Sequence, residues 1–182
     1  MRLPRLCLVL LTLFGCTPGR DLPPIPPGSG DYRLGPGDAV RLITFGEDGL
    51  TGDFRVSDAG TIAVPLLGGV RAAGLTPAEL EKSMADKLRR AKLLRDPSVS
   101  AEVTAYRPIF VLGEVNKPGE YPYQPGMTVV TAAAVAGGFT YRAILDYASV
   151  VRTVNGRAVE GKAMRQTYLQ PGDVITVFER RF

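Results

Sequence analysis

The chain of 182 residues contains no histidine and no tryptophan, and it has only two cysteines. The lack of histidine excludes Ser-His-Asp and Cys-His catalysis, histidine-ligated metal sites and the usual switch that responds to physiological pH. The other residues form no cluster of the usual metal-ligand type and no phosphate-binding loop. The sequence therefore predicts a protein that is not an enzyme, with no catalytic residues, no metal and no cofactor.

The chain also lacks a large excess of one charge, since it has 22 basic and 18 acidic residues, for a net charge of +4. A nucleic-acid-binding protein usually shows a clustered basic patch, so we expect no nucleic-acid partner. Apolar residues make up 45% of the chain and charged residues 22%, as in an ordinary globular protein. The 21 glycines and 15 prolines favour short strands and many turns over long helices.

The N-terminal residues have the pattern of a secretory signal. Arg2 and Arg5 precede an apolar run over 6–14, which is too short to cross a bilayer because a spanning helix needs about 20 residues. The run leads into the letters LFGC, which resemble a bacterial lipobox ending at Cys16. We predict a signal peptide over 1–15 and lipidation of Cys16. The alternative is an ordinary signal peptide followed by an incidental cysteine.

Cys16 would be the only cysteine of the mature chain, because Cys7 lies within the predicted signal peptide. No intramolecular disulfide is then possible, and lipidation would remove a lone thiol from an oxidising compartment. Thr17 follows Cys16, so the acidic residue that commonly retains lipoproteins in the inner membrane is absent. The sequence predicts a lipid-anchored protein of the outer membrane that faces the periplasm.

Residues 16–30 comprise Cys16 and a proline-rich stretch, TPGRDLPPIPPGSG. Such a composition forms no core and tends to the polyproline II conformation. We interpret the stretch as a linker that spans at most about 45 Å between the lipid and the folded part. A proline-rich ligand for a partner domain is the alternative.

A Pro-Gly-Asp turn occurs twice, and each copy precedes an apolar strand pattern. Proline fixes φ, glycine permits positive φ and aspartate bonds nearby backbone amides, so each copy is interpreted as a structural turn. A recurring catalytic carboxylate is the alternative, which we consider the weaker one. The six turn residues are Pro36, Gly37, Asp38, Pro171, Gly172 and Asp173.

Two helices and several hairpins are expected. Thr76 and Glu79 form a capping box before a helix whose apolar residues recur every fourth position, and Thr128 caps a short helix over 129–135. We predict one hairpin over 54–63 and another at Asn155-Gly156. The fold class is α+β with two small domains, over 31–106 and 107–182.

We interpret the acidic residues Glu47, Asp48, Asp53 and Asp58 as loop charges, and the basic residues Arg89, Arg90, Lys92 and Arg95 as a solvated helix end.

These motifs resemble those of a known family. Residues 32–103 contain LGPGD, VSDAGTIAVPLLGGVRAAGLT and DPSVSAEV, and they resemble a polysaccharide export domain. Residues 109–178 contain VLGEVNKPGEYPYQPGMTVVTAAAVAGGFT and LQPGDVITV, and they resemble the SLBB (soluble-ligand-binding β-grasp) domain. In this order, after a lipobox and a proline-rich segment, they resemble the bacterial outer-membrane polysaccharide biosynthesis/export family, the Wza-like proteins.

The resemblance implies a homo-oligomeric ring or adaptor that carries exopolysaccharide or capsular polysaccharide, working with an inner-membrane polysaccharide co-polymerase. Long members of the family add further β-grasp repeats and a C-terminal pore helix. The present sequence stops after one such unit, so it resembles a short member that would need a separate outer-membrane channel. The alternative is a monomeric periplasmic module that binds a soluble ligand or a glycan through its β-grasp domain.

Overall fold

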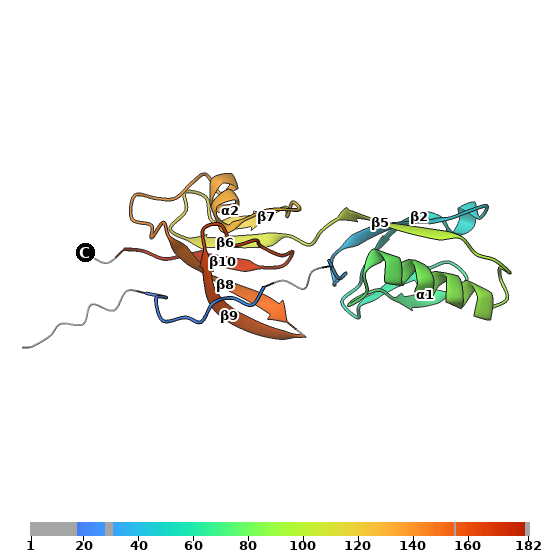
Figure 1. Ribbon diagram of the computed structural model, residues 1–182. Coiled ribbons are helices and arrows are strands. Elements are labelled where there is room, and N and C mark those ends of the chain that lie inside the picture. Colours follow the sequence, from blue (N-terminus) through green and yellow to red (C-terminus); the bar gives the residue numbers. More distant parts are fainter. Residues whose placement is uncertain (1–17, 28–30, 155, 181–182) are drawn as a thin grey trace, which may run out of the picture.

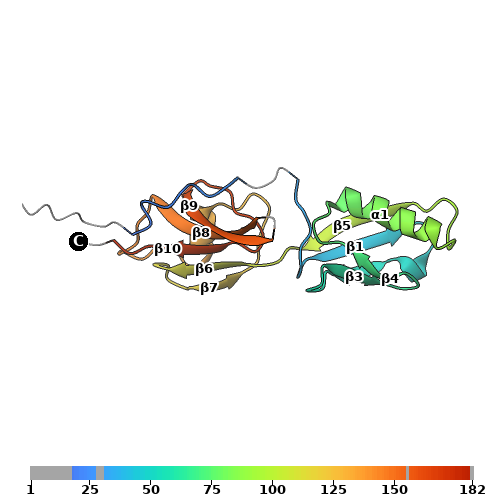
Figure 2. The ribbon, with the colours of Figure 1, turned by 90° about the horizontal axis from the view of Figure 1, so that it is seen from below.

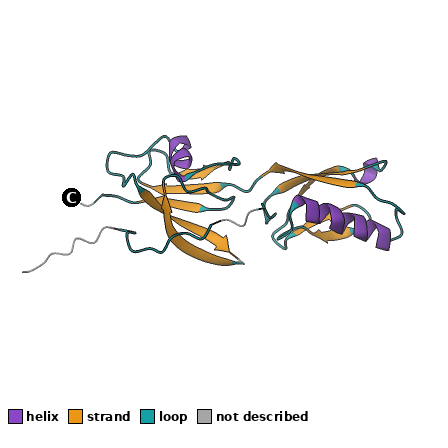
Figure 3. Cartoon of the chain, viewed as in Figure 1, coloured by secondary structure: helices purple, strands orange, loops and turns teal. Residues whose placement is uncertain are grey.

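The computed structural model describes residues 18–27, 31–154 and 156–180. These residues form two α+β domains placed end to end, each built from short strands and a helix (Figures 1 and 3). The predicted fold class is therefore confirmed. Cys16 and the predicted signal peptide over 1–15 lie outside the described residues. Among the described residues, no helix has the length and the apolar character needed to cross a membrane.

The first domain packs one helix against one face of a three-stranded antiparallel sheet, in the order β2-β1-β5. Apolar side chains of β1 and of the helix share one buried cluster, so the core lies between the two layers. A two-stranded sheet, β3-β4, completes this domain. The elements are β1 (Ala39–Thr44), η1 (Asp48–Leu50), β2 (Gly52–Arg55), β3 (Thr61–Val64), β4 (Gly68–Arg71), α1 (Pro77–Arg90) and β5 (Val99–Ala105).

Helix α1 begins with the predicted capping box. The Glu79 amide donates to Thr76 Oγ1 over 3.1 Å, and the Thr76 amide donates to Glu79 Oε2 over 2.9 Å. The bond from the Thr76 amide, together with the nearby Arg33 guanidinium, lowers the pKa of Glu79. The carboxylate thus stays charged at the positive end of the helix dipole.

The hairpin predicted over 54–63 is wrong in its pairing. Phe54 of β2 pairs with Val40 of β1, whereas Ile62 of β3 pairs with Val70 of β4. The turn at 58–60 therefore forms a corner between two sheets. Turn residues specify that the chain reverses, but the burial of Ile62 and Val70 in the common core decides which strands pair.

The second domain is a five-stranded sheet in the order β7-β6-β10-β8-β9. Strands β6 and β10 are parallel and the other pairs are antiparallel. The β8–β9 register ends at Val154 opposite Arg157, which fits the predicted two-residue hairpin, although Asn155 is outside the described residues. The elements are β6 (Ile109–Gly113), β7 (Gly119–Tyr121), α2 (Val129–Val135), β8 (Tyr147–Val154), β9 (Arg157–Met164) and β10 (Val174–Val177).

Residues 18–27, which we call the N-terminal strap, differ from the free linker that their composition predicts. The strap runs along the outer edge of β9 (Figure 2). The Ile25 amide donates to the Lys162 carbonyl over 2.9 Å, and the Lys162 amide donates to the Pro23 carbonyl over 2.7 Å. Ile25 is only 7% exposed and belongs to the core of the second domain. Ile25 helps to dock the strap, because its side chain fills an apolar site beside a sheet edge whose backbone groups can pair with the strap.

Candidate functional site

The two Pro-Gly-Asp turns have the same internal geometry. In the first, the Gly35 amide donates to Asp38 Oδ2 over 2.7 Å. In the second, the Gln170 amide donates to Asp173 Oδ2, also over 2.7 Å. Gly37 and Gly172 have φ angles of +94° and +85°, which favour glycine. Each aspartate thus closes its own turn, and each also accepts from an arginine.

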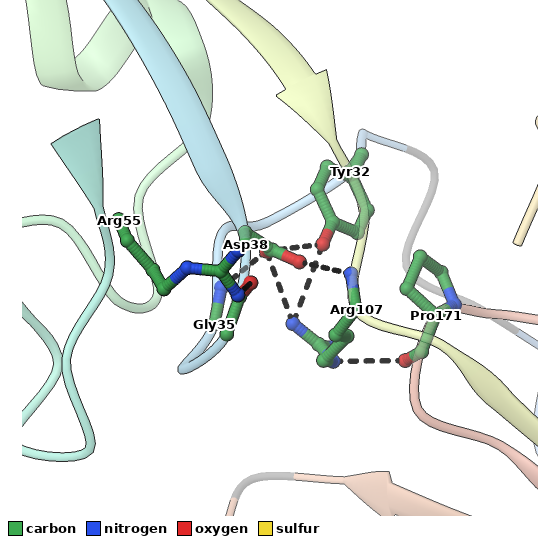
Figure 4. Close-up of polar contacts among 7 residues, drawn as sticks. Tyr32, Gly35, Asp38, Arg55, Arg107 and Pro171 are labelled. Carbon is green, nitrogen blue, oxygen red and sulfur yellow. Dashed lines mark hydrogen bonds and ion pairs between the residues drawn. The ribbon is translucent and has the colours of Figure 1, made fainter. Parts of the chain in front are cut away.

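Arg107 lies between the two domains and contacts both turns (Figure 4). Its amide donates to Asp38 Oδ1 over 2.8 Å, and its Nη1 donates to Asp38 Oδ2 over 3.2 Å. Its Nε donates to the Pro171 carbonyl in the other domain over 3.0 Å. Asp38 is fully buried, so this ion pair is shielded from solvent on the carboxylate side. One side chain from the segment between β5 and β6 therefore joins the two domains.

Tyr32 adds an aromatic contact to the junction. Its hydroxyl donates to Asp38 Oδ2 and accepts from Arg107 Nη1 over 3.3 Å. The Tyr32 ring packs edge-on against Tyr106 at 5.0 Å between centroids, and Tyr106 packs in the same way against Tyr123 at 5.5 Å. Burial and the hydrogen bond to Asp38 raise the pKa of Tyr32 well above its usual value. The phenol therefore stays protonated at physiological pH and remains a donor.

Glycine leaves room for the Arg107 side chain at both turns. A Cβ atom on Gly35 would lie 2.1 Å from Arg107 Nη1, and one on Gly172 would lie 2.8 Å from Arg107 Nε. Both turns thus leave the space that the guanidinium occupies. The repeated glycines serve turn geometry and also this close approach.

The second aspartate is held by a buried arginine on β8. Arg152 donates to Asp173 through Nε at 3.0 Å and through Nη2 at 2.6 Å, and the two side chains are 3% and 1% exposed. Arg152 also donates to the carbonyls of Pro26 in the strap, over 2.9 Å, and of Tyr168, over 3.1 Å. Paired, two-point contacts of this kind are the strong form of the arginine–carboxylate interaction.

Sequence reasoning found both aspartates but missed Arg107 and Arg152. A signal for Arg152 was available, because it follows Ala148 and Val150 at alternate positions and so lies on the apolar face of its strand. A charge at such a position needs a partner. No comparable signal marks Arg107, whose partners lie far away along the chain.

The other charged residues that the sequence singled out lie away from the junction. Asp53 pairs with Arg41 across β1 and β2 at 3.1 Å, with both side chains exposed. Arg89 pairs with Asp86 on the surface of α1. In the described ranges, no set of three or more metal-ligating side chains comes together.

The polar groups of the junction hold one another in place. Asp38 and Asp173 accept from backbone amides and guanidinium groups, so their oxygens are already used by donors. Across the described part of the chain, every buried side-chain nitrogen or oxygen has a hydrogen-bond partner. Full satisfaction of a buried polar network makes it rigid and fixes one arrangement.

Comparison with known proteins assigns both domains. A family model for the polysaccharide biosynthesis/export protein matches residues 26–104, and a model for the SLBB domain matches residues 108–165. The chain therefore carries a domain of the polysaccharide biosynthesis/export family. The resemblance noted in the sequence is therefore confirmed. Residues 26–104 form the export domain of this family, the SLBB domain follows, and Arg107 lies between the two matches.

Three relatives illustrate the family. The chain is 36% identical over 119 residues to the exopolysaccharide production protein ExoF of Rhizobium meliloti (strain 1021), which covers 59% of this chain and 28% of ExoF. It is 33% identical over 105 residues to the EPS I polysaccharide export outer membrane protein EpsA of Ralstonia nicotianae, covering 56% and 27%. It is 27% identical over 110 residues to the polysialic acid transport protein KpsD of Escherichia coli, covering 59% and 20%. The aligned region thus spans about a quarter of the length of these relatives.

Proposed function

We propose that this chain is a lipid-anchored, periplasm-facing component of an outer-membrane apparatus that exports exopolysaccharide or capsular polysaccharide. The observation that carries the proposal is the pair of matches, an export domain followed directly by an SLBB domain. The names of the relatives support it, since EpsA is called a polysaccharide export outer membrane protein and KpsD a polysialic acid transport protein. The N-terminal sequence supports a lipid anchor at Cys16.

In this function the chain acts as a scaffold. Transport through a ring needs rigid subunits and an interface that closes on itself, and it needs no catalytic group. A head-to-tail ring requires two different surfaces on each subunit, and two dissimilar domains held in a fixed arrangement offer such surfaces. We propose a homo-oligomeric ring that receives the polysaccharide from an inner-membrane co-polymerase.

The first test is secretion by a strain that lacks the gene. We expect loss of extracellular polysaccharide, measured as sugar in the culture medium, and recovery when the intact gene is supplied on a plasmid. The physical reason is that a polar glycan of high mass does not cross a lipid bilayer unaided. Unchanged secretion, in a strain with no second copy of the gene, would contradict the proposal and favour a periplasmic binding module.

The lipid anchor is tested separately with Cys16→Ser. We expect the variant to move from the membrane fraction to the soluble periplasmic fraction and to reduce export, because two acyl chains give stable membrane attachment and a serine gives none. Cys7→Ser, in the apolar run of the predicted signal, is the matched control and should fractionate like the parent protein. Membrane fractionation and full export by the Cys16 variant would contradict the anchor.

A further inference from the structure

The N-terminal strap and the domain junction meet at the second Pro-Gly-Asp turn. We propose that the strap is a clamp that fixes the angle between the export domain and the SLBB domain, acting through Arg152 and this turn. With the strap docked on β9 the domain angle is set, and with the strap displaced the junction loosens. The inference concerns the described residues alone and holds whether or not the chain exports polysaccharide.

The first step is the contact between the strap and Arg152. Arg152 Nη1 donates to the Pro26 carbonyl, while Nε and Nη2 hold the Asp173 carboxylate. The same guanidinium therefore contacts the strap and the turn. Because Arg152 and Asp173 are almost completely buried, loss of the strap carbonyl would leave a buried donor without a protein acceptor.

The second step is the contact between the turn and the junction. Arg107 Nε donates to the Pro171 carbonyl, and the Gly172 amide donates to the Pro108 carbonyl over 3.0 Å. The turn thus holds two consecutive residues of the segment that connects the domains. Arg107 in turn holds Asp38 in the export domain. A shift of this turn therefore changes the contacts that orient the export domain.

The chain itself supplies a second route. Pro27 at the end of the strap and Asp31 at the start of the export domain are four residues apart, so they lie within about 14 Å of each other. Tyr32, the next residue, packs on Tyr106 and donates to Asp38. A docked strap therefore limits the movement of the export domain, whereas a displaced strap does not.

The strap is held weakly enough to be displaced. Its backbone bonds to β9 are the two made by Lys162, and five of its ten positions are prolines, which carry no amide donor. Three side-chain bonds add to these: from Arg152 Nη1 to the Pro26 carbonyl over 2.9 Å, from Lys162 Nζ to the Arg20 carbonyl over 2.8 Å and from Tyr147 Oη to the Pro18 carbonyl over 3.0 Å. One buried side chain, Ile25, anchors it in the core. The strap is thus less firmly held than a full strand.

Gly161→Ala tests the proposal. A Cβ atom on Gly161 would lie 2.6 Å from Ile25 Cα and 2.7 Å from its backbone nitrogen, so the strap has to move. Gly119→Ala on the edge strand β7 is the matched control, because a Cβ atom there meets nothing within 4 Å. Neither glycine has a positive φ, so both substitutions make the same chemical change.

The measurement is amide hydrogen exchange on the full chain, supported by small-angle X-ray scattering. In Gly161→Ala we expect the amides of Ile25 and Arg107 to exchange about tenfold faster or more, and the distribution of interdomain distances to widen. Gly119→Ala should match the parent protein in both measurements. Ile25→Asp, which places a charge in the core site of the strap, is the second variant and should give the same result.

Two outcomes overturn the proposal. In the first, the backbone amide at position 25 loses its protection from exchange in either variant, but the Arg107 amide exchanges at the rate of the parent protein and the scattering is unchanged. The strap would then only cover the edge of β9. In the second, both variants keep the strap protected, which would show that the strap is not displaceable.

Discussion

Arg152→Ala is expected to lower the free energy of unfolding by about 3–5 kcal/mol, the usual effect of removing one partner of a buried ion pair. Asp173 is 1% exposed and would lose both guanidinium bonds, keeping only the amide of Gln170. The carbonyls of Pro26 and Tyr168 would lose their donor as well. Urea unfolding followed by far-UV circular dichroism measures the change.

Arg41→Ala is the control for this prediction. Arg41 also lies on a strand and pairs with an aspartate, Asp53, at 3.1 Å, but the side chains of both residues in this pair are exposed. Exposed pairs contribute about 0–1 kcal/mol, so this variant should unfold close to the parent protein. A similar small loss for both variants would mean that water replaces Arg152 at Asp173, and the buried network would then be less important than its geometry suggests.

Gly113→Ala is expected to lower the free energy of unfolding by about 2–5 kcal/mol, the sum of backbone strain and overpacking. Gly113 ends β6 with a φ of +81°, which is unfavourable for alanine. A Cβ atom there would lie 2.1 Å from the Val177 carbonyl oxygen, on the neighbouring strand β10. Strands β6 and β10 would have to separate, at the centre of the five-stranded sheet.

Gly126→Ala separates the two contributions. Gly126 has a φ of +83°, but a Cβ atom there meets nothing within 4 Å. This variant should lose only the strain, about 1–2 kcal/mol, when measured by the same urea unfolding. Equal losses at both positions would show that the close approach of Gly113 to β10 is relieved without separating the strands.

Features that depend on a few neighbouring residues could be predicted from the sequence. The capping box of α1 needs only Thr76 and Glu79, and the turn around Asp38 needs only the residues that precede it. In each case the hydrogen bonds join residues three positions apart, so the sequence itself carries the geometry.

Features that join distant segments could not be predicted. Arg107 lies 69 positions from Asp38 and 64 from Pro171, and no local pattern marks it as their partner. The pairing of β3 with β4 was also missed, because burial in the shared core decides it. The strap was missed because proline content suggested an extended spacer, while its docking depends on Ile25 and on hydrogen bonds to residues far along the chain.

The docked strap brings the two ends of the described chain to the same side of the SLBB domain. Tyr147 donates to the Pro18 carbonyl, and the ring of Phe178 lies against Gly19, so both ends meet at the same pole of the SLBB domain (Figure 1). The export domain occupies the opposite pole. A molecule immobilised on a sensor chip through either end would therefore present its export domain to the solution, with α1 and the loops beyond it accessible to an injected partner. To measure a partner that binds the SLBB pole, the molecule would instead have to be attached to the chip through a side chain of the export domain.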